Sequence, residues 1–184
     1  GQNVYASEEN LYVAATSYEQ IRIQPMMKPM PIDASDASAP AVRADAAIVA
    51  SPPYEAPKQE TIIYQFGLNS GKAVYKNTGK VPGHLLNQFS MDEHNGFLRL
   101  ATTTDVGLWK NHVYILDAGL KQVGKIEDIA PGERIYSTRF MGDRAYMVTF
   151  KNTDPLFVMD LKEPAAPKLL GALKIPGYSN YLHP

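Results

Sequence analysis

Three consecutive residues with side chains suited to acid–base or metal chemistry, Asp92, Glu93 and His94, stand directly before Asn95-Gly96. Carboxylates and imidazole carry protons in catalysis and bind metal ions. An Asn-Gly pair between two apolar runs predicts a type I′ hairpin turn, because both central positions of that turn need a positive φ. The three polar residues therefore adjoin a turn, where charged side chains usually meet water. We expect a solvated hairpin end here, and an acid–base or metal site is the alternative.

The other titratable residues do not have the spacing of a catalytic or metal site. The four histidines, His84, His94, His112 and His183, are far apart, and no HxH or HExxH pair occurs. The acidic run before Asn95 lacks the alternating oxygen ligands of a calcium-binding loop. No GxSxG elbow and no glycine-rich phosphate loop is present, and the chain contains no cysteine. We expect no catalytic residues, no metal and no cofactor.

The elements that position these residues are short strands. Between residues 130 and 177, four runs rich in β-branched, aromatic or aliphatic residues are separated by Gly, Asp, Asn and Pro, and each run predicts a strand. In the run 144–150 both alternating faces are largely apolar. We therefore expect an antiparallel sheet that is packed on both sides. The four predicted strands span 135–141, 144–150, 156–161 and 168–174.

The same unit recurs along the chain. Alignment of "VPGHLLNQFSM", "APGERIYSTRFM" and "IPGYSNYLHP" places Pro82, Pro131 and Pro176 in register, 49 and 45 residues apart. A period of about 40 to 50 residues with four strands per repeat is that of a β-propeller, in which the blades stand around a central channel. The sequence predicts an all-β fold of about three four-stranded antiparallel blades.

The repeat assigns residues 3–81 to blade one, 84–130 to blade two and 134–175 to blade three, and a fourth blade starts at 178–184. The expected strands lie near 3–6, 10–18, 61–67 and 72–77 in blade one and at 85–91, 97–104, 112–117 and 122–127 in blade two. Residues 19–60 interrupt blade one and hold seven of the 14 prolines. Such a stretch builds little core, so we expect a surface insertion, and a lid or partner-docking arm is the alternative.

Composition excludes several classes of protein. The net charge of −1 gives no reason to expect nucleic acid or an acidic membrane surface as a partner, and no apolar run is long enough to span a bilayer. Closed propellers need about four to eight blades, so we expect a fragment of a larger propeller. Its bare end blades are expected to self-associate or to pair their terminal strands with a second copy.

The repeat also indicates where a ligand would bind. Arg139 lies on the first strand of its blade, the strand that lines the channel in propellers, where it can bind an anion or pair with a carboxylate of a neighbouring blade. Asn87 and Gln88 occupy the matching strand of blade two, and His183 lies in blade four. We expect a channel ligand to contact these four residues.

Two aspartates follow the third strands in similar contexts, Asp117 in "YILD" and Asp160 in "FVMD". An aspartate at the end of a strand commonly accepts hydrogen bonds from backbone N–H groups of the following turn. We predict this structural role for both residues.

The segments "LLNQFSMDEHNGFLRLATTT", "GERIYSTRFMGDRAYMVTF", "DPLFVMDL" and "IPGYSNYLHP" together resemble an uncharacterised family of secreted bacterial and archaeal proteins. These proteins contain a β-propeller domain distantly related to WD40 repeats. The resemblance covers about residues 3–18 and 60–184. It implies an extracytoplasmic or membrane-anchored propeller with further blades after residue 184, and it brings no known substrate or catalytic residues.

We therefore expect a binding or scaffold module for an unknown protein or glycan, because propellers present loops and a channel to their partners. The alternative is a hydrolase or lyase that acts on an extracellular polymer at the channel mouth. A paired carboxylate near Arg139 and His183 would favour the enzyme, and a channel filled by apolar side chains would count against it.

Overall fold

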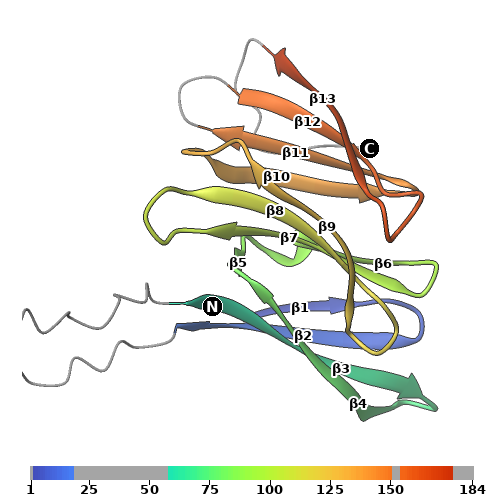
Figure 1. Cartoon of the computed structure of the whole chain (residues 1–184). Coiled ribbons are helices and arrows are strands. Elements are labelled where there is room, and N and C mark those ends of the chain that lie inside the picture. Colours follow the sequence, from blue (N-terminus) through green and yellow to red (C-terminus); the bar gives the residue numbers. More distant parts are fainter. Residues whose placement is uncertain (1, 19–57, 151–153, 176–184) are drawn as a thin grey trace, which may run out of the picture.

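The computed structural model describes residues 2–18, 58–150 and 154–175 of the chain. In these ranges the regular structure is β-strand, apart from one short 3-10 helix. Three antiparallel sheets of four to five strands lie one upon another as successive layers (Figure 1). The prediction of an all-β fold is confirmed. The described ranges contain no helix that is long and apolar enough to cross a membrane.

The first and third sheets are simple meanders in which each strand pairs with the next along the chain. The first sheet consists of β1 (Gln2–Ala6), β2 (Asn10–Tyr18), β3 (Gln59–Asn69) and β4 (Lys72–Pro82). The third sheet consists of β10 (Arg134–Met141), β11 (Arg144–Phe150), β12 (Asp154–Asp160) and β13 (Lys168–Ile175). β3 begins inside the range 19–60 that the sequence assigned to an insertion. Residues 19–57 of that range, and the predicted start of a fourth blade at 178–184, lie outside the described residues.

The second sheet departs from the predicted pattern at its first strand. Its elements are β5 (His84–Leu85), the 3-10 helix η1 (Gln88–Ser90), β6 (Met91–His94), β7 (Phe97–Thr104), β8 (Lys110–Leu116) and β9 (Gln122–Ile129). β5 and β6 both pair with β7, and η1 separates them. The prediction of one continuous strand over 85–91 is therefore wrong.

Asn87 explains this interruption. Its side-chain oxygen accepts a hydrogen bond from the backbone N–H of Phe89 at 2.9 Å, and its own carbonyl accepts from the N–H of Ser90 at 3.1 Å. Asparagine favours such local bonds over a strand ladder, because its side chain reaches the backbone two residues ahead. The chain thus leaves the sheet for one turn and returns to it as β6.

The turns after these strands have the conformations and hydrogen bonds that the sequence predicts. Asn95 and Gly96 have φ angles of 51° and 77°, as the predicted hairpin requires. The carboxylate of Asp117 accepts hydrogen bonds from the N–H groups of Gly119 and Lys121, both at 2.9 Å. Asp160 accepts one from the N–H of Lys162 at 3.0 Å. The turn-fixing role predicted for both aspartates is confirmed.

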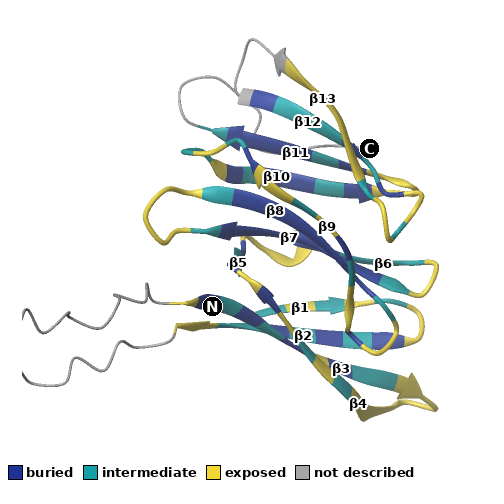
Figure 2. Cartoon of the chain, viewed as in Figure 1, coloured by how far each residue is buried: buried dark blue, intermediate teal, exposed yellow. Residues whose placement is uncertain are grey.

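Two apolar cores hold the layers together, one at each interface between sheets. Figure 2 shows buried residues along the strands of the middle layer and exposed residues along the outer strands β4 and β13. On β7, successive residues alternate between the cores, because neighbouring side chains of a strand point to opposite faces. The core between the first and second sheets contains Tyr12, Ala14, Ile63, Val81, Leu85, Met91, Leu98, Leu100, Tyr114, Leu116 and Leu120. The core between the second and third contains Ala101, Val113, Ile115, Ile129, Ile135, Phe140, Ala145, Met147, Met159 and Leu161.

Candidate functional site

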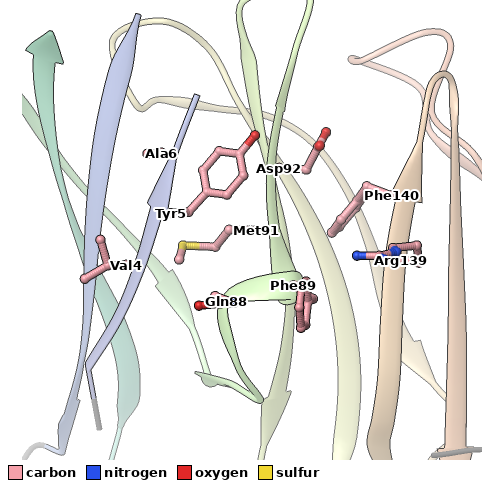
Figure 3. A pocket seen from close by; sticks show the side chains of 9 residues that line it. All are labelled: Val4, Tyr5, Ala6, Gln88, Phe89, Met91, Asp92, Arg139 and Phe140. Carbon is pink, nitrogen blue, oxygen red and sulfur yellow. The ribbon is translucent and has the colours of Figure 1, made fainter. Parts of the chain in front are cut away.

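The first strands of all three sheets converge on one cavity of about 420 Å³. β1 forms one wall, η1 and the start of β6 form the floor and back, and β10 forms the opposite wall (Figure 3). The lining combines apolar and aromatic side chains with a few polar groups, the composition typical of a small-ligand site. The lining residues are Val4, Tyr5, Ala6, Gln88, Phe89, Met91, Asp92, Arg139 and Phe140.

Arg139 provides the cationic group of this cavity. Its guanidinium carbon lies 5.0 Å from the centroid of the Phe89 ring, which comes from η1 of the neighbouring sheet. A guanidinium over an aromatic face is attracted by the electrons of the ring, and the flat contact restricts its orientation. Because η1 carries Phe89 out of the sheet, the interruption of the first strand positions this pair.

Asp92 lines the same cavity as Arg139 and is held by a second arginine, Arg99. Arg99 is only 3% exposed, and its Nε donates to Oδ2 of Asp92 at 2.9 Å. The Nη1 of Arg99 also donates to the backbone carbonyl of Gly142 in the third sheet, and its guanidinium packs on the ring of Phe140. The sequence position of Asp92 suggested a solvated hairpin end. The structure instead places this carboxylate in an ion pair with Arg99. It orients an arginine that joins two sheets.

Glu93 points the other way and binds the first sheet. Its carboxylate accepts from the hydroxyl of Ser7 at 2.6 Å and from the side-chain amide of Asn10 at 2.9 Å. Its backbone N–H donates to the hydroxyl of Tyr5 at 3.0 Å. Glu93 is half-buried, and its contacts with the neighbouring sheet depart from the solvated hairpin end that the sequence predicted. His94 likewise faces Asp143 of the third sheet, with Nε2 and Oδ1 3.4 Å apart.

Burial raises the pKa of the Tyr5 hydroxyl, and the nearby carboxylates of Asp92 and Glu93 act in the same direction. The phenol therefore keeps its proton. Tyr5 lines the cavity from β1, on the wall opposite Arg139, and contributes a neutral phenol to the lining.

Comparison with known proteins explains why three repeated sheets share one cavity. The whole chain, residues 1–184, matches the family described as Beta propeller domain. The chain belongs to this family. Each sheet is thus a blade, and β1, β5–β6 and β10 are the first strands of three consecutive blades.

The relatives of this propeller include two uncharacterised archaeal proteins. The chain is 61% identical over 113 residues to a protein of Methanocaldococcus jannaschii, a match that covers 58% of the chain and 18% of that protein. It is 57% identical over 104 residues to a protein of Archaeoglobus fulgidus, which covers 56% of the chain and 16% of that protein. The matches span less than a fifth of each relative. No solved structure matches the chain.

The described histidines His84 and His112 lie next to polar side chains of the propeller. His84 lies 3.0 Å from the side-chain amide of Gln59. His112 is buried beside Thr104, and this burial lowers the pKa of its imidazole. Across the described ranges, no three residues of the types His, Cys, Asp and Glu are grouped as a metal ion requires.

The propeller brings two of the four predicted ligand residues together, since Arg139 and Gln88 both line the cavity. Asn87 caps η1, and His183 lies outside the described residues. Sequence reasoning did not identify Phe89 as the residue beneath Arg139. The available signal was Asn87, because an asparagine two residues before an aromatic residue can turn the chain out of a strand.

Proposed function

We propose that this propeller is a binding module whose cavity between the first strands of its blades accepts a carboxylate-bearing group. The observation that carries the proposal is the pair of Arg139 and Phe89 in a cavity to which three blades contribute. A guanidinium can donate two parallel hydrogen bonds to one carboxylate, which gives both affinity and a fixed orientation.

The rest of the lining is compatible with an anionic ligand. Asp92 is the carboxylate among the described lining residues, and Arg99 binds it in an ion pair. The side chains of Val4, Met91 and Phe140 offer apolar surface to the rest of the ligand. We propose an acidic peptide segment or an acidic sugar as the source of the carboxylate.

The cavity gives less support to a hydrolase or lyase. Acid–base cleavage of a polymer commonly needs two carboxyl groups at the reacting bond. Among the described residues that line the cavity, Asp92 is the one carboxylate, and it is bound by Arg99. The described lining thus provides no pair of carboxyl groups, so we retain the binding function.

Arg139→Gln is expected to abolish or weaken binding of the acidic ligand on the order of tenfold to a hundredfold, because a hydrogen-bonded ion pair is lost. The measurement is binding of the chain to an array of acidic peptides and to an array of acidic oligosaccharides, followed by calorimetric titration of the best ligand. The array that responds identifies the source of the carboxylate.

Arg134→Gln is the matched control. Arg134 lies on the same strand, and its guanidinium also packs on an aromatic ring, 5.5 Å from the centroid of Trp109, but it does not line the cavity. This variant is expected to bind like the wild type. Equal loss in both variants, or no response on either array, would refute the proposed site.

We further propose an extracytoplasmic location for this propeller. Support comes from the resemblance of its motifs to secreted propeller proteins distantly related to WD40 repeats. Protease added to intact cells of the source organism is expected to cleave the protein while a cytoplasmic marker stays whole. Survival of the protein until the cells are lysed would contradict this location.

A further inference from the structure

The fourth strand of each blade carries a glycine in its interior. These residues are Gly79 on β4, Gly124 on β9 and Gly171 on β13, spaced 45 and 47 residues apart. All three are strand residues outside the left-handed region of φ, so the backbone conformation does not require glycine. Glycine in a strand interior often marks a close approach of another backbone. The third-strand residues paired with them are Ile63, Ile115 and Val158, respectively.

Gly79 makes room for the next blade. A Cβ atom at this position would lie 2.7 Å from Cβ of Leu120 and 2.8 Å from its carbonyl oxygen. Leu120 belongs to the loop between the third and fourth strands of blade two and is 5% exposed. The side chain of Asn77 donates to the carbonyl of Ala118 in the same loop at 3.1 Å, which fixes the contact.

Gly124 repeats this contact one blade further on. A Cβ atom here would lie 1.9 Å from the carbonyl oxygen of Pro164 and 3.0 Å from Cδ of Pro167. Both prolines belong to the loop between the third and fourth strands of blade three. At two successive junctions, therefore, a loop of the following blade packs directly on the glycine of the preceding one.

Gly171 also lies inside the fourth strand of its blade but has no such neighbour in the described part of the chain. No heavy atom of the described residues lies within 4 Å of a Cβ built at Gly171. Close to it, Leu169, Leu170 and Leu173 are 44%, 50% and 62% exposed. At the first two junctions, a loop of the next blade occupies the space beside the glycine. At Gly171 this space is open among the described residues, and exposed leucines lie close to it in the sequence.

We propose that Gly171 is the docking position for the loop between the third and fourth strands of a further blade of the full-length protein. By analogy with Leu120 and Pro164, that loop places a backbone carbonyl and an apolar side chain on the glycine. The length of the relatives supports this occupant, because the matched segments make up only 18% and 16% of their chains. The inference concerns blade assembly and is independent of the ligand cavity.

Gly171→Ala tests the proposal when it is made both in the 184-residue chain and in the full-length protein from the native source. In the 184-residue chain the Tm is expected to stay within about 1 °C or to rise, because alanine fits a strand better than glycine when nothing clashes. In the full-length protein the same change is expected to lower the Tm by about 3–10 °C, because the added methyl group overpacks the junction.

Gly124→Ala is the positive control, since it is expected to lower the Tm in both chains, and Gly79→Ala replaces it if that variant does not fold. A silent Gly171→Ala in the full-length protein would overturn the proposal. A second copy of the chain, the self-association expected from bare end blades, is the competing occupant. If light scattering shows a dimer of the 184-residue chain that Gly171→Ala dissociates, the second copy occupies the position and the proposal is wrong.

Discussion

Arg99→Met is expected to lower the free energy of unfolding by about 3 kcal/mol, the lower end of the cost of breaking a buried ion pair, because the remaining partner Asp92 is 26% exposed. Arg99 is 3% exposed, and it joins Asp92 of blade two to the carbonyl of Gly142 in blade three. Methionine fills most of the volume but leaves the carboxylate without its cation. Urea unfolding followed by circular dichroism measures the change.

Two further variants isolate the role of the charge. The double variant Asp92→Leu/Arg99→Met is expected to recover much of the loss, because an apolar pair of similar volume often replaces a buried ion pair without destabilisation. Lys80→Met removes an exposed ion pair with Glu60 and is expected to change stability by less than about 1 kcal/mol. A loss for Arg99→Met no larger than that of Lys80→Met would show that the buried pair does not stabilise the junction.

Glu93→Ala is expected to lower the free energy of unfolding by about 2–3 kcal/mol, because hydrogen bonds to a charged acceptor are lost. The hydroxyl of Ser7 and the side-chain amide of Asn10 both donate to this carboxylate. Asn10 is 4% exposed, so water does not readily replace the acceptor. Hydrogen exchange is expected to accelerate in β1, the strand of blade one that precedes this loop.

Glu8→Ala is the matched control for this change, since Glu8 is an exposed glutamate one residue after Ser7. It is expected to leave stability and exchange unchanged. Arg99→Met serves as a second control, because it is expected to accelerate exchange in β10 and β11 and to spare β1. If Glu93→Ala accelerated exchange equally in all three blades, a local junction between blades one and two would be ruled out.

These two predictions concern adjacent residues that bind different neighbouring blades. Asp92, through Arg99, binds blade three, and Glu93 binds blade one. Neighbouring residues of a strand point to opposite faces, so a middle blade can hold both neighbours from one short strand. The same strand starts at the cavity, so the proposed ligand site and the blade junctions share the hairpin β6–β7.

The local features and the repeat could be predicted from the sequence alone. Strand periodicity, the Asn95-Gly96 turn and the aspartates after the third strands depend on neighbouring residues, so they could be predicted without knowledge of the fold. The regular spacing of Pro82, Pro131 and Pro176 then identified the propeller, because a repeat of this length has few other architectures.

The roles of the polar residues follow from contacts between blades, which the sequence does not reveal. From the sequence alone, Asp92 and Glu93 are expected to face water. Their partners Arg99, Ser7 and Asn10 become neighbours only through strand pairing and blade packing. The cavity arises in the same way, from residues up to 136 positions apart that no local pattern connects. Local propensity fixes which residues form strands, whereas contacts between blades fix which side chains share a site.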